Sequence, residues 1–109
     1  MAPAHVHTPL SIAPGASYID YEPLGVVCVM GAWNFPIQTL LGPALQCVAA
    51  GNCVVFKASE LAPHTSRALC KLVSNYLDRK FYRAIEGQVK VAIALTSMRF
   101  DMFVFTGST

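Results

Sequence analysis

The sequence predicts an α/β protein built on a doubly wound parallel sheet, with the element order β-α-β-α-β-α-β. Two observations indicate this fold. Short apolar runs rich in valine, such as GVVCVM at 25–30 and CVVFK at 53–57, suit strands buried on both faces. The segments between such runs carry apolar pairs that recur every four positions, which is typical of one helical face. Strands that alternate with helices in this way favour a parallel sheet.

The first half of the chain contains an extension, a strand and a helix. Residues 1–20 show no periodicity and contain three prolines and a glycine, so we expect a linker or a peripheral extension. The strand at 25–30 leads through the loop GAWNFP into a helix at 37–50. Pro43 leaves two alternatives: a kinked helix, or two short segments of which Pro43 opens the second. Gly51 suits a left-handed cap that ends the helix.

The second half repeats the alternation. Lys57 ends the strand at 53–57, and Pro63 is well placed as the first residue of the next helix. Apolar pairs recur every four residues from Ala68 to Leu77, and the charged run at 78–80 reads as a solvated helix end. The remaining predicted elements are a weaker strand at 81–87, a short helix at 89–97 and a last strand at 101–107.

The composition is unusual for a free-standing domain of 109 residues. Hydrophobic residues make up 54% of the chain and the mean hydropathy is +0.47, whereas charged residues make up only 13%, against roughly 25% in ordinary soluble domains. No segment approaches the ~20 uninterrupted apolar residues of a membrane-spanning helix. The first ten residues lack the pattern of a signal peptide. We therefore expect a piece of a larger protein, in which an open edge on the last strand and exposed apolar surface favour aggregation or a partner.

Charge and cysteine content exclude several classes of function. The net charge is +2 without a basic run, so nucleic-acid or membrane-surface binding has no electrostatic support. None of the four cysteines forms a Cys-x-x-Cys pair, and no histidine stands at metal-ligand spacing from them, so we expect no metal site. The cysteines read as buried thiols of a reducing compartment: Cys28, Cys47, Cys53 and Cys70.

Four loops follow the predicted strands, and the rule for doubly wound sheets places ligands beyond these carboxyl ends. The loops are GAWNFP, KASE, EGQV and TGST. Neither the glycine-rich dinucleotide fingerprint nor a P-loop is present in them.

The residues of these loops leave two interpretations each. Asn34 could hold a developing oxyanion, or it could be a turn residue or helix cap. Lys57 and Glu60 could bind ribose hydroxyls, or they could form a surface ion pair of little energetic value. The turn Gly107–Ser108 could present backbone N–H groups to a phosphate, or it could be an ordinary turn.

Three strings stand in order and at plausible spacing: EPLGVVCVMGAWNFP, AAGNCVVFKASE and FDMFVFTGST. Together they resemble the aldehyde dehydrogenase superfamily, and most of all its class 3, fatty-aldehyde-like branch. The resemblance covers residues 21–109. It implies that this part of the chain is an incomplete Rossmann-like domain that binds NAD or NADP.

The resemblance also implies a role for individual residues. Asn34 matches the amide of the oxyanion hole, and Gly31, Ala32 and Trp33 match the loop along the nicotinamide. Lys57 and Glu60 match the pair that holds the adenosine ribose hydroxyls, and Gly107 and Ser108 match the turn before the pyrophosphate helix. In this family the cofactor does not lie on a glycine-rich turn, which accounts for the missing fingerprint.

The sequence departs from the family pattern in two of these loops. Ala58 replaces a proline, which we expect to loosen the turn between Lys57 and Glu60. EGQV replaces Glu-Gly-Gly-Pro, which we expect to narrow the groove on the adenine side. The choice between NAD and NADP stays open, because Glu60 repels a 2′-phosphate whereas class 3-like members are tolerant.

The implied activity is the NAD- or NADP-dependent oxidation of an aldehyde to a carboxylic acid. The cysteine nucleophile and glutamate base of the family lie in regions that match nothing in this sequence, so we expect no turnover from the chain alone. The alternative is a truncated, non-catalytic paralogue that binds nucleotide weakly or pairs with a full-length subunit. We further expect a homo-oligomeric parent with an aldehyde substrate and a cytoplasmic location, and membrane anchoring of the parent stays open.

Overall fold

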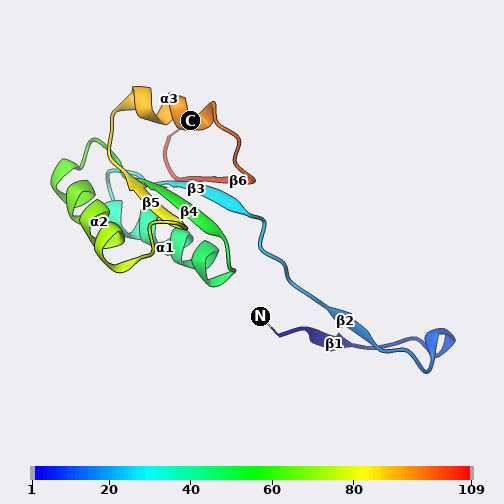
Figure 1. Ribbon diagram of the computed structural model, residues 1–109. Coiled ribbons are helices and arrows are strands. Elements are labelled where there is room, and N and C mark those ends of the chain that lie inside the picture. Colours follow the sequence, from blue (N-terminus) through cyan, green and yellow to red (C-terminus); the bar gives the residue numbers. More distant parts are fainter. Residues whose placement is uncertain (1, 109) are drawn as a thin grey trace.

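The computed structural model describes residues 2–108 and contains a four-stranded parallel sheet (Figure 1). Its strands are β3 (Val26–Met30), β4 (Cys53–Lys57), β5 (Tyr82–Ile85) and β6 (Met102–Phe105). They stand in the order β5-β4-β3-β6, and each neighbouring pair runs parallel. The predicted parallel α/β sheet is therefore confirmed, and β6 lies at one edge of it.

Helices cover both faces of the sheet. α1 (Pro36–Ala49) and α2 (Pro63–Tyr76) lie on one side, and α3 (Val89–Thr96) lies on the other (Figure 1). The chain enters the sheet at β3, moves outward through β4 to β5, and returns past β3 to form β6. The winding direction therefore reverses between β3 and β6, and this is the point where open α/β sheets bind ligands.

The sheet separates two apolar cores of unequal size. β3 is buried on both faces, since Val27, Cys28 and Val29 are fully inaccessible. The larger core lies under α1 and α2 and includes Val27, Val29 and Phe56. The smaller core lies under α3 and contains three buried residues, Cys28, Met30 and Leu95. A strand that serves both cores cannot alternate between polar and apolar residues, and the run VVCVM follows from this.

Two local predictions about α1 have different outcomes. The helix is continuous from Pro36 to Ala49 with Pro43 inside it, so the two-segment alternative is wrong. Leu40 and Ala44 flank the proline and are both buried in the same core, which keeps the two halves of the helix together. Gly51 has a φ of +88°, as the predicted left-handed cap requires.

The N-terminal segment is more ordered than the sequence suggested. β1 (Ala4–Val6) pairs antiparallel with β2 (Ser17–Ile19), and a short 3-10 helix, η1 (Leu10–Ile12), lies between them. Figure 1 shows this hairpin extending away from the body of the protein. Strands of three residues are too short to show a period in the sequence, which explains why the hairpin was not predicted.

Burial of the cysteines was predicted for all four, and this is correct only for Cys28. Cys47, Cys53 and Cys70 are half-buried, and Cys47 and Cys70 pack against the outside of the larger core. Over residues 2–108, no group of three His, Cys, Asp or Glu side chains is arranged to hold a metal ion. No helix of that range is sufficiently long and apolar to span a bilayer.

Candidate functional site

A cleft of about 470 Å³ opens where β3, β4 and β6 end. It lies at the point where the winding direction of the sheet reverses. Three loops and α3 supply its lining. All eight residues singled out in the sequence lie on this lining: Gly31, Ala32, Trp33, Asn34, Lys57, Glu60, Gly107 and Ser108. The topology thus brings together residues that are up to 77 positions apart in the chain, counted from 31 to 108.

The fourth loop lies beside this cleft. Glu86, Gly87 and Gln88 line a neighbouring hollow of about 280 Å³ together with Ser59 and Glu60. The loop EGQV therefore adjoins the loop KASE, as expected for the ends of the adjacent strands β4 and β5.

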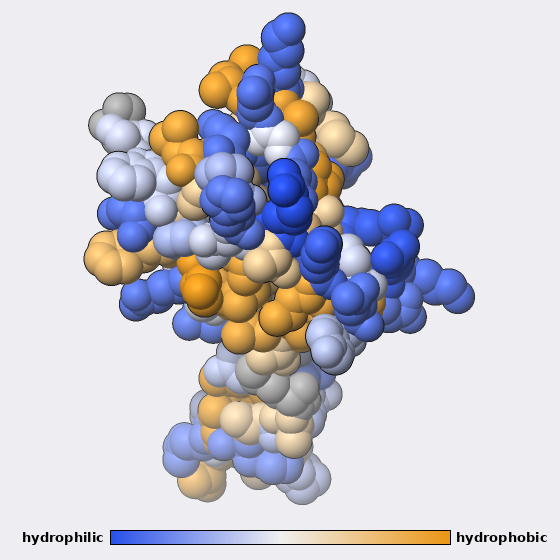
Figure 2. All heavy atoms as spheres, turned by 90° about the vertical axis from the view of Figure 1, so that its left-hand side faces the viewer, coloured by the Kyte–Doolittle hydropathy of each residue, from blue (hydrophilic) through white to orange (hydrophobic). Residues whose placement is uncertain are grey.

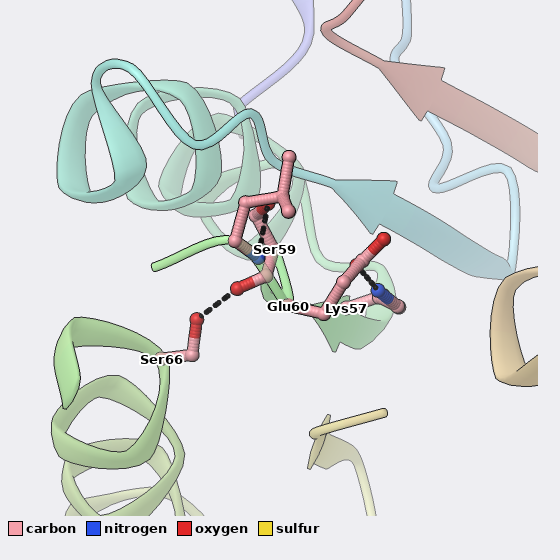
Figure 3. A network of polar contacts seen from close by, with 5 residues as sticks. Lys57, Ser59, Glu60 and Ser66 are labelled. Carbon is pink, nitrogen blue, oxygen red and sulfur yellow. Dashed lines mark hydrogen bonds and ion pairs between the residues drawn. The ribbon is translucent and has the colours of Figure 1, made fainter. Parts of the chain in front are cut away.

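Lys57 and Glu60 form a short ion pair on the wall of the cleft. Lys57 is the last residue of β4 and its side chain is only 5% exposed, whereas that of Glu60 is 31% exposed. The Lys57 Nζ donates to Glu60 Oε2 at 2.6 Å (Figure 3). This hydrogen bond, with help from a backbone N–H, lowers the pKa of Glu60 despite its partial burial. The pair therefore differs from a freely solvated surface ion pair. The positive charge of the buried Lys57 ammonium is balanced by the Glu60 carboxylate.

Two serines that the sequence analysis did not single out fix the turn that carries this pair. The Ser66 hydroxyl, in the first turn of α2, donates to the Ser59 carbonyl at 2.5 Å (Figure 3). The Ser59 hydroxyl accepts from the Leu61 N–H at 3.4 Å. Ser66 is 3% exposed, so this bond is shielded from water. A serine near a helix start is a common sign of such local bonds, but its partner could not be chosen from the sequence.

Ala58 does not leave this turn loose. It is 3% exposed, and its N–H donates to the Ile85 carbonyl at 3.4 Å. A proline could not make this bond, because it has no N–H. In place of the rigid proline ring of the family pattern, this chain therefore has a backbone hydrogen bond that links the ends of β4 and β5.

The loop between β3 and α1 is held by Thr39, a residue that the sequence analysis also missed. The Thr39 hydroxyl accepts from the Ala32 N–H at 2.9 Å and donates to the Phe35 carbonyl at 2.8 Å. Gly31 allows the loop to lie against the helix, because a Cβ on it would stand 2.9 Å from the Cβ of Leu40. Both ends of the loop are thus fastened to α1.

Asn34 lies in the middle of this fastened loop and is exposed. The N-cap of α1 is Phe35, so the interpretation of Asn34 as the helix cap is wrong. Asn34 lines the cleft, and within the described part of the chain its side chain makes no hydrogen bond. The neighbouring Trp33 is 61% exposed on the same lining.

The turn after β6 closes the third side of the cleft. A Cβ on Gly107 would lie 2.5 Å from a ring carbon of Phe105, so a larger residue in this turn would displace that exposed ring. The helix that was predicted to follow would begin beyond Ser108, outside the described residues. The phosphate role of Gly107 and Ser108 stays a prediction.

Comparison with known proteins identifies the family. The family model described as "Aldehyde dehydrogenase family" matches residues 4–109, nearly the whole chain. The chain belongs to the aldehyde dehydrogenase family. Residues 4–20 are included in the match, so the hairpin belongs to the family pattern as well as the sheet.

The relatives include members of aldehyde dehydrogenase family 3, which confirms the resemblance to the class 3 branch. An aldehyde dehydrogenase of Craterostigma plantagineum is 46% identical over 109 residues, covering 100% of this chain and 23% of that protein. Aldehyde dehydrogenase family 3 member I1, chloroplastic, of Arabidopsis thaliana is 47% identical over 107 residues, covering 98% and 20%.

A solved structure supports the same assignment. The substrate-bound state of AldH from Staphylococcus aureus superposes with a TM-score of 0.93 at 36% identity, and it covers 97% of this chain and 23% of that one. The chain thus spans about a fifth of the length of these aldehyde dehydrogenases.

Proposed function

We propose that this chain forms part of the cofactor site of an NAD- or NADP-dependent aldehyde dehydrogenase and supplies one donor to its oxyanion hole. The observation that carries the proposal is the Lys57–Glu60 pair, which lies on the cleft at the reversal point of the sheet. An ammonium that donates and a carboxylate that accepts suit the two hydroxyls of a ribose. The cleft volume of about 470 Å³ lies within the usual range of ligand sites, roughly 300–1,000 Å³.

Different residues of the cleft would contact different parts of the dinucleotide. Lys57 and Glu60 would hold the adenosine ribose, and the loop from Gly31 to Trp33 would lie beside the nicotinamide. When bound, the dinucleotide supplies the acceptor for a hydride. The protein's own contribution is to fix the ribose and to keep this loop in place through Thr39.

Asn34 is suited to stabilise negative charge on the aldehyde oxygen. Its amide can donate a hydrogen bond and has no other partner among the described residues. Such a donor acts where charge develops as the carbonyl carbon is attacked, and its removal typically costs about 3 kcal/mol of transition-state stabilisation. Because Thr39 fixes the loop on both sides of Asn34, the donor is held ready before the substrate arrives.

None of the four thiols has the properties of the attacking nucleophile. Burial raises the pKa of Cys28 to about 11. Burial, together with the nearby Glu86 carboxylate, also raises the pKa of Cys70. A nucleophilic cysteine needs the opposite environment, exposed and electropositive. Cys47 and Cys53 do not lie on the cleft lining. We therefore assign cofactor binding, and no turnover, to this chain by itself.

Two measurements test the proposal. NAD titrated into the purified 109-residue chain should quench the fluorescence of Trp33, the single tryptophan, and Lys57→Met should weaken this binding about tenfold through loss of the charge-assisted bond to the ribose. Lys71→Met, on the exposed side of α2, is the matched control. Incubation of the chain with NAD and a medium-chain aldehyde should yield no NADH. Absence of saturable binding, or clear NADH formation, would overturn the corresponding half of the proposal.

A second candidate, pairing with a larger aldehyde dehydrogenase subunit, is favoured by the exposed apolar surface. Figure 2 shows apolar side chains gathered on the body above the hairpin, with hydrophilic side chains around them. On the edge strand β6, Phe103 and Phe105 are 40% and 64% exposed. Patches and edges of this kind are typical of protein contacts. Co-purification of the tagged chain with a full-length family member tests this candidate.

A further inference from the structure

A third hollow, of about 510 Å³, lies beside Glu60, between the turn after β4 and the start of α3. It is lined by Glu60 and Leu61 from the turn after β4, and by Gln88, Val89 and Lys90 from the start of α3. Glu60 also lines the main cleft, so the two spaces meet at this carboxylate. A group attached to the ribose beside Glu60 would therefore extend toward Lys90. The inference below rests on the proposed cofactor site.

The charges around this hollow favour an anion. Glu60 is ionised and would alone repel a phosphate, but Lys57 Nζ lies 2.6 Å from it and offsets that charge. Lys90 is exposed and forms no ion pair within residues 2–108. The Glu86 carboxylate faces Arg67 at 4.0 Å and lines the second hollow. The three groups Lys57, Glu60 and Lys90 thus sum to one positive charge.

We propose that Lys90 is a specificity-determining residue, which receives the 2′-phosphate of NADP and gives this chain a preference for NADP over NAD. A phosphate monoester carries about −1.5 to −2 charges at neutral pH and offers three acceptor oxygens, which an ammonium can engage as a point charge. Glu60 keeps its role as the acceptor for the ribose, since Lys57 neutralises it.

The test compares two probes that differ only in the 2′-phosphate: 5′-AMP and adenosine 2′,5′-bisphosphate. Both are titrated calorimetrically into the full 109-residue chain. We expect the bisphosphate to bind about fivefold more tightly, as for one exposed charge pair. Lys90→Gln should abolish this preference and leave the affinity for 5′-AMP unchanged. Lys90→Arg should retain it, and raised ionic strength should weaken it.

Lys80→Gln is the matched control. Lys80 is an exposed lysine just before β5, at the opposite end of that strand from Lys90. Its replacement changes the net charge by the same amount and should leave the preference intact. Circular dichroism confirms that each variant is folded.

The outcomes separate the two proposals. If neither probe binds the wild-type chain, the cofactor site itself is refuted and the role of Lys90 with it. If 5′-AMP binds but the bisphosphate gains nothing, or if Lys80→Gln lowers the preference as much as Lys90→Gln, the cofactor site stands and the role of Lys90 is refuted. A preference that is lost only in Lys90→Gln supports the inference.

Discussion

The two edges of the parallel sheet use their polar side chains differently. At the amino edge, where the strands begin, polar side chains form hydrogen bonds with backbone groups. Asp101 Oδ2 accepts from the Val26 N–H at 2.7 Å, and Asn52 accepts from the Gly25 N–H at 3.0 Å while donating to the Cys47 carbonyl at 3.1 Å. At the carboxyl edge the Thr39 and Ser66 hydroxyls also bind the backbone, but Asn34 has no partner among the described residues and Lys57 pairs with another side chain, Glu60.

This difference separates stability from function within one sheet. A polar group that is bound to the backbone holds strands together but has nothing left to offer a ligand. A polar group that is free, or bound only to another side chain, can exchange its partner for a ligand at small loss. The carboxyl edge is also where the cleft lies, so geometry and hydrogen bonding independently indicate the same site.

The largest effect is expected from a change at the amino edge. Gly25 has a φ of +127°, and a Cβ on it would overlap the Asp101 carboxylate. Gly25→Ala therefore combines backbone strain with displacement of the residue that fastens β6 to β3. We expect a loss of about 3 kcal/mol in the free energy of unfolding, measured by urea denaturation.

Gly42→Ala is the control for that change. Gly42 lies inside α1, and nothing stands within 4 Å of a Cβ placed on it. Alanine should therefore stabilise the helix by about 0.5–1 kcal/mol. If the free energy of unfolding falls equally in both variants, the close approach of Gly25 and Asp101 does not stabilise the amino edge.

Much of this arrangement could be predicted from the sequence, because the body is built from local patterns. β3 is buried on both faces, and its run of apolar residues shows this directly. Pro63 does begin α2, and the strand at 81–87 and helix at 89–97 exist as β5 and α3. Ligands of open parallel sheets bind beyond the carboxyl ends of the strands, and this rule was sufficient to predict that the candidate residues lie together.

The bonds that hold the two edges could not be predicted, because their partners are distant in the chain. Asp101 and Val26 are 75 positions apart, and Asn52 and Gly25 are 27 apart. No periodicity marks such a pair. Thr39 and Ser66 are closer to their partners, but a hydroxyl in the first turn of a helix has several neighbouring backbone groups to choose from.

Replacement of an asparagine by alanine at each edge tests this difference between the two edges. Asn52 is 6% exposed and makes two bonds to the backbone, so Asn52→Ala should lower the free energy of unfolding by about 2 kcal/mol. Asn34 is exposed and makes none, so Asn34→Ala should stay within about 0.5 kcal/mol of wild type. Chemical denaturation of the two variants in parallel measures the difference. Equal losses would show that the loop after β3 is part of the scaffold.

The smallest effect concerns the pH dependence of the Lys57–Glu60 pair. The bond from Lys57 lowers the pKa of Glu60 below its ordinary value, which is about 4.3 in an unfolded chain. The stabilisation from this pair is therefore fully present above that ordinary value, and it is lost as the pH falls through the lowered value of the folded state. Because Glu60 is partly solvated, we expect a contribution below about 1 kcal/mol.

Glu60→Gln isolates this contribution. The variant keeps the size of the side chain but cannot ionise. Between pH 6 and about 3, its free energy of unfolding should therefore fall less than that of wild type, and the difference is the contribution of Glu60. Glu22→Gln, at an exposed position before the sheet, should keep the wild-type curve. If Glu60→Gln also keeps it, the bond to Lys57 adds nothing to folding. The turn that carries Glu60 would then be held by the bonds of Ser59, Ser66 and the Ala58 N–H, and the carboxyl edge would owe its order to bonds with the backbone, as the amino edge does.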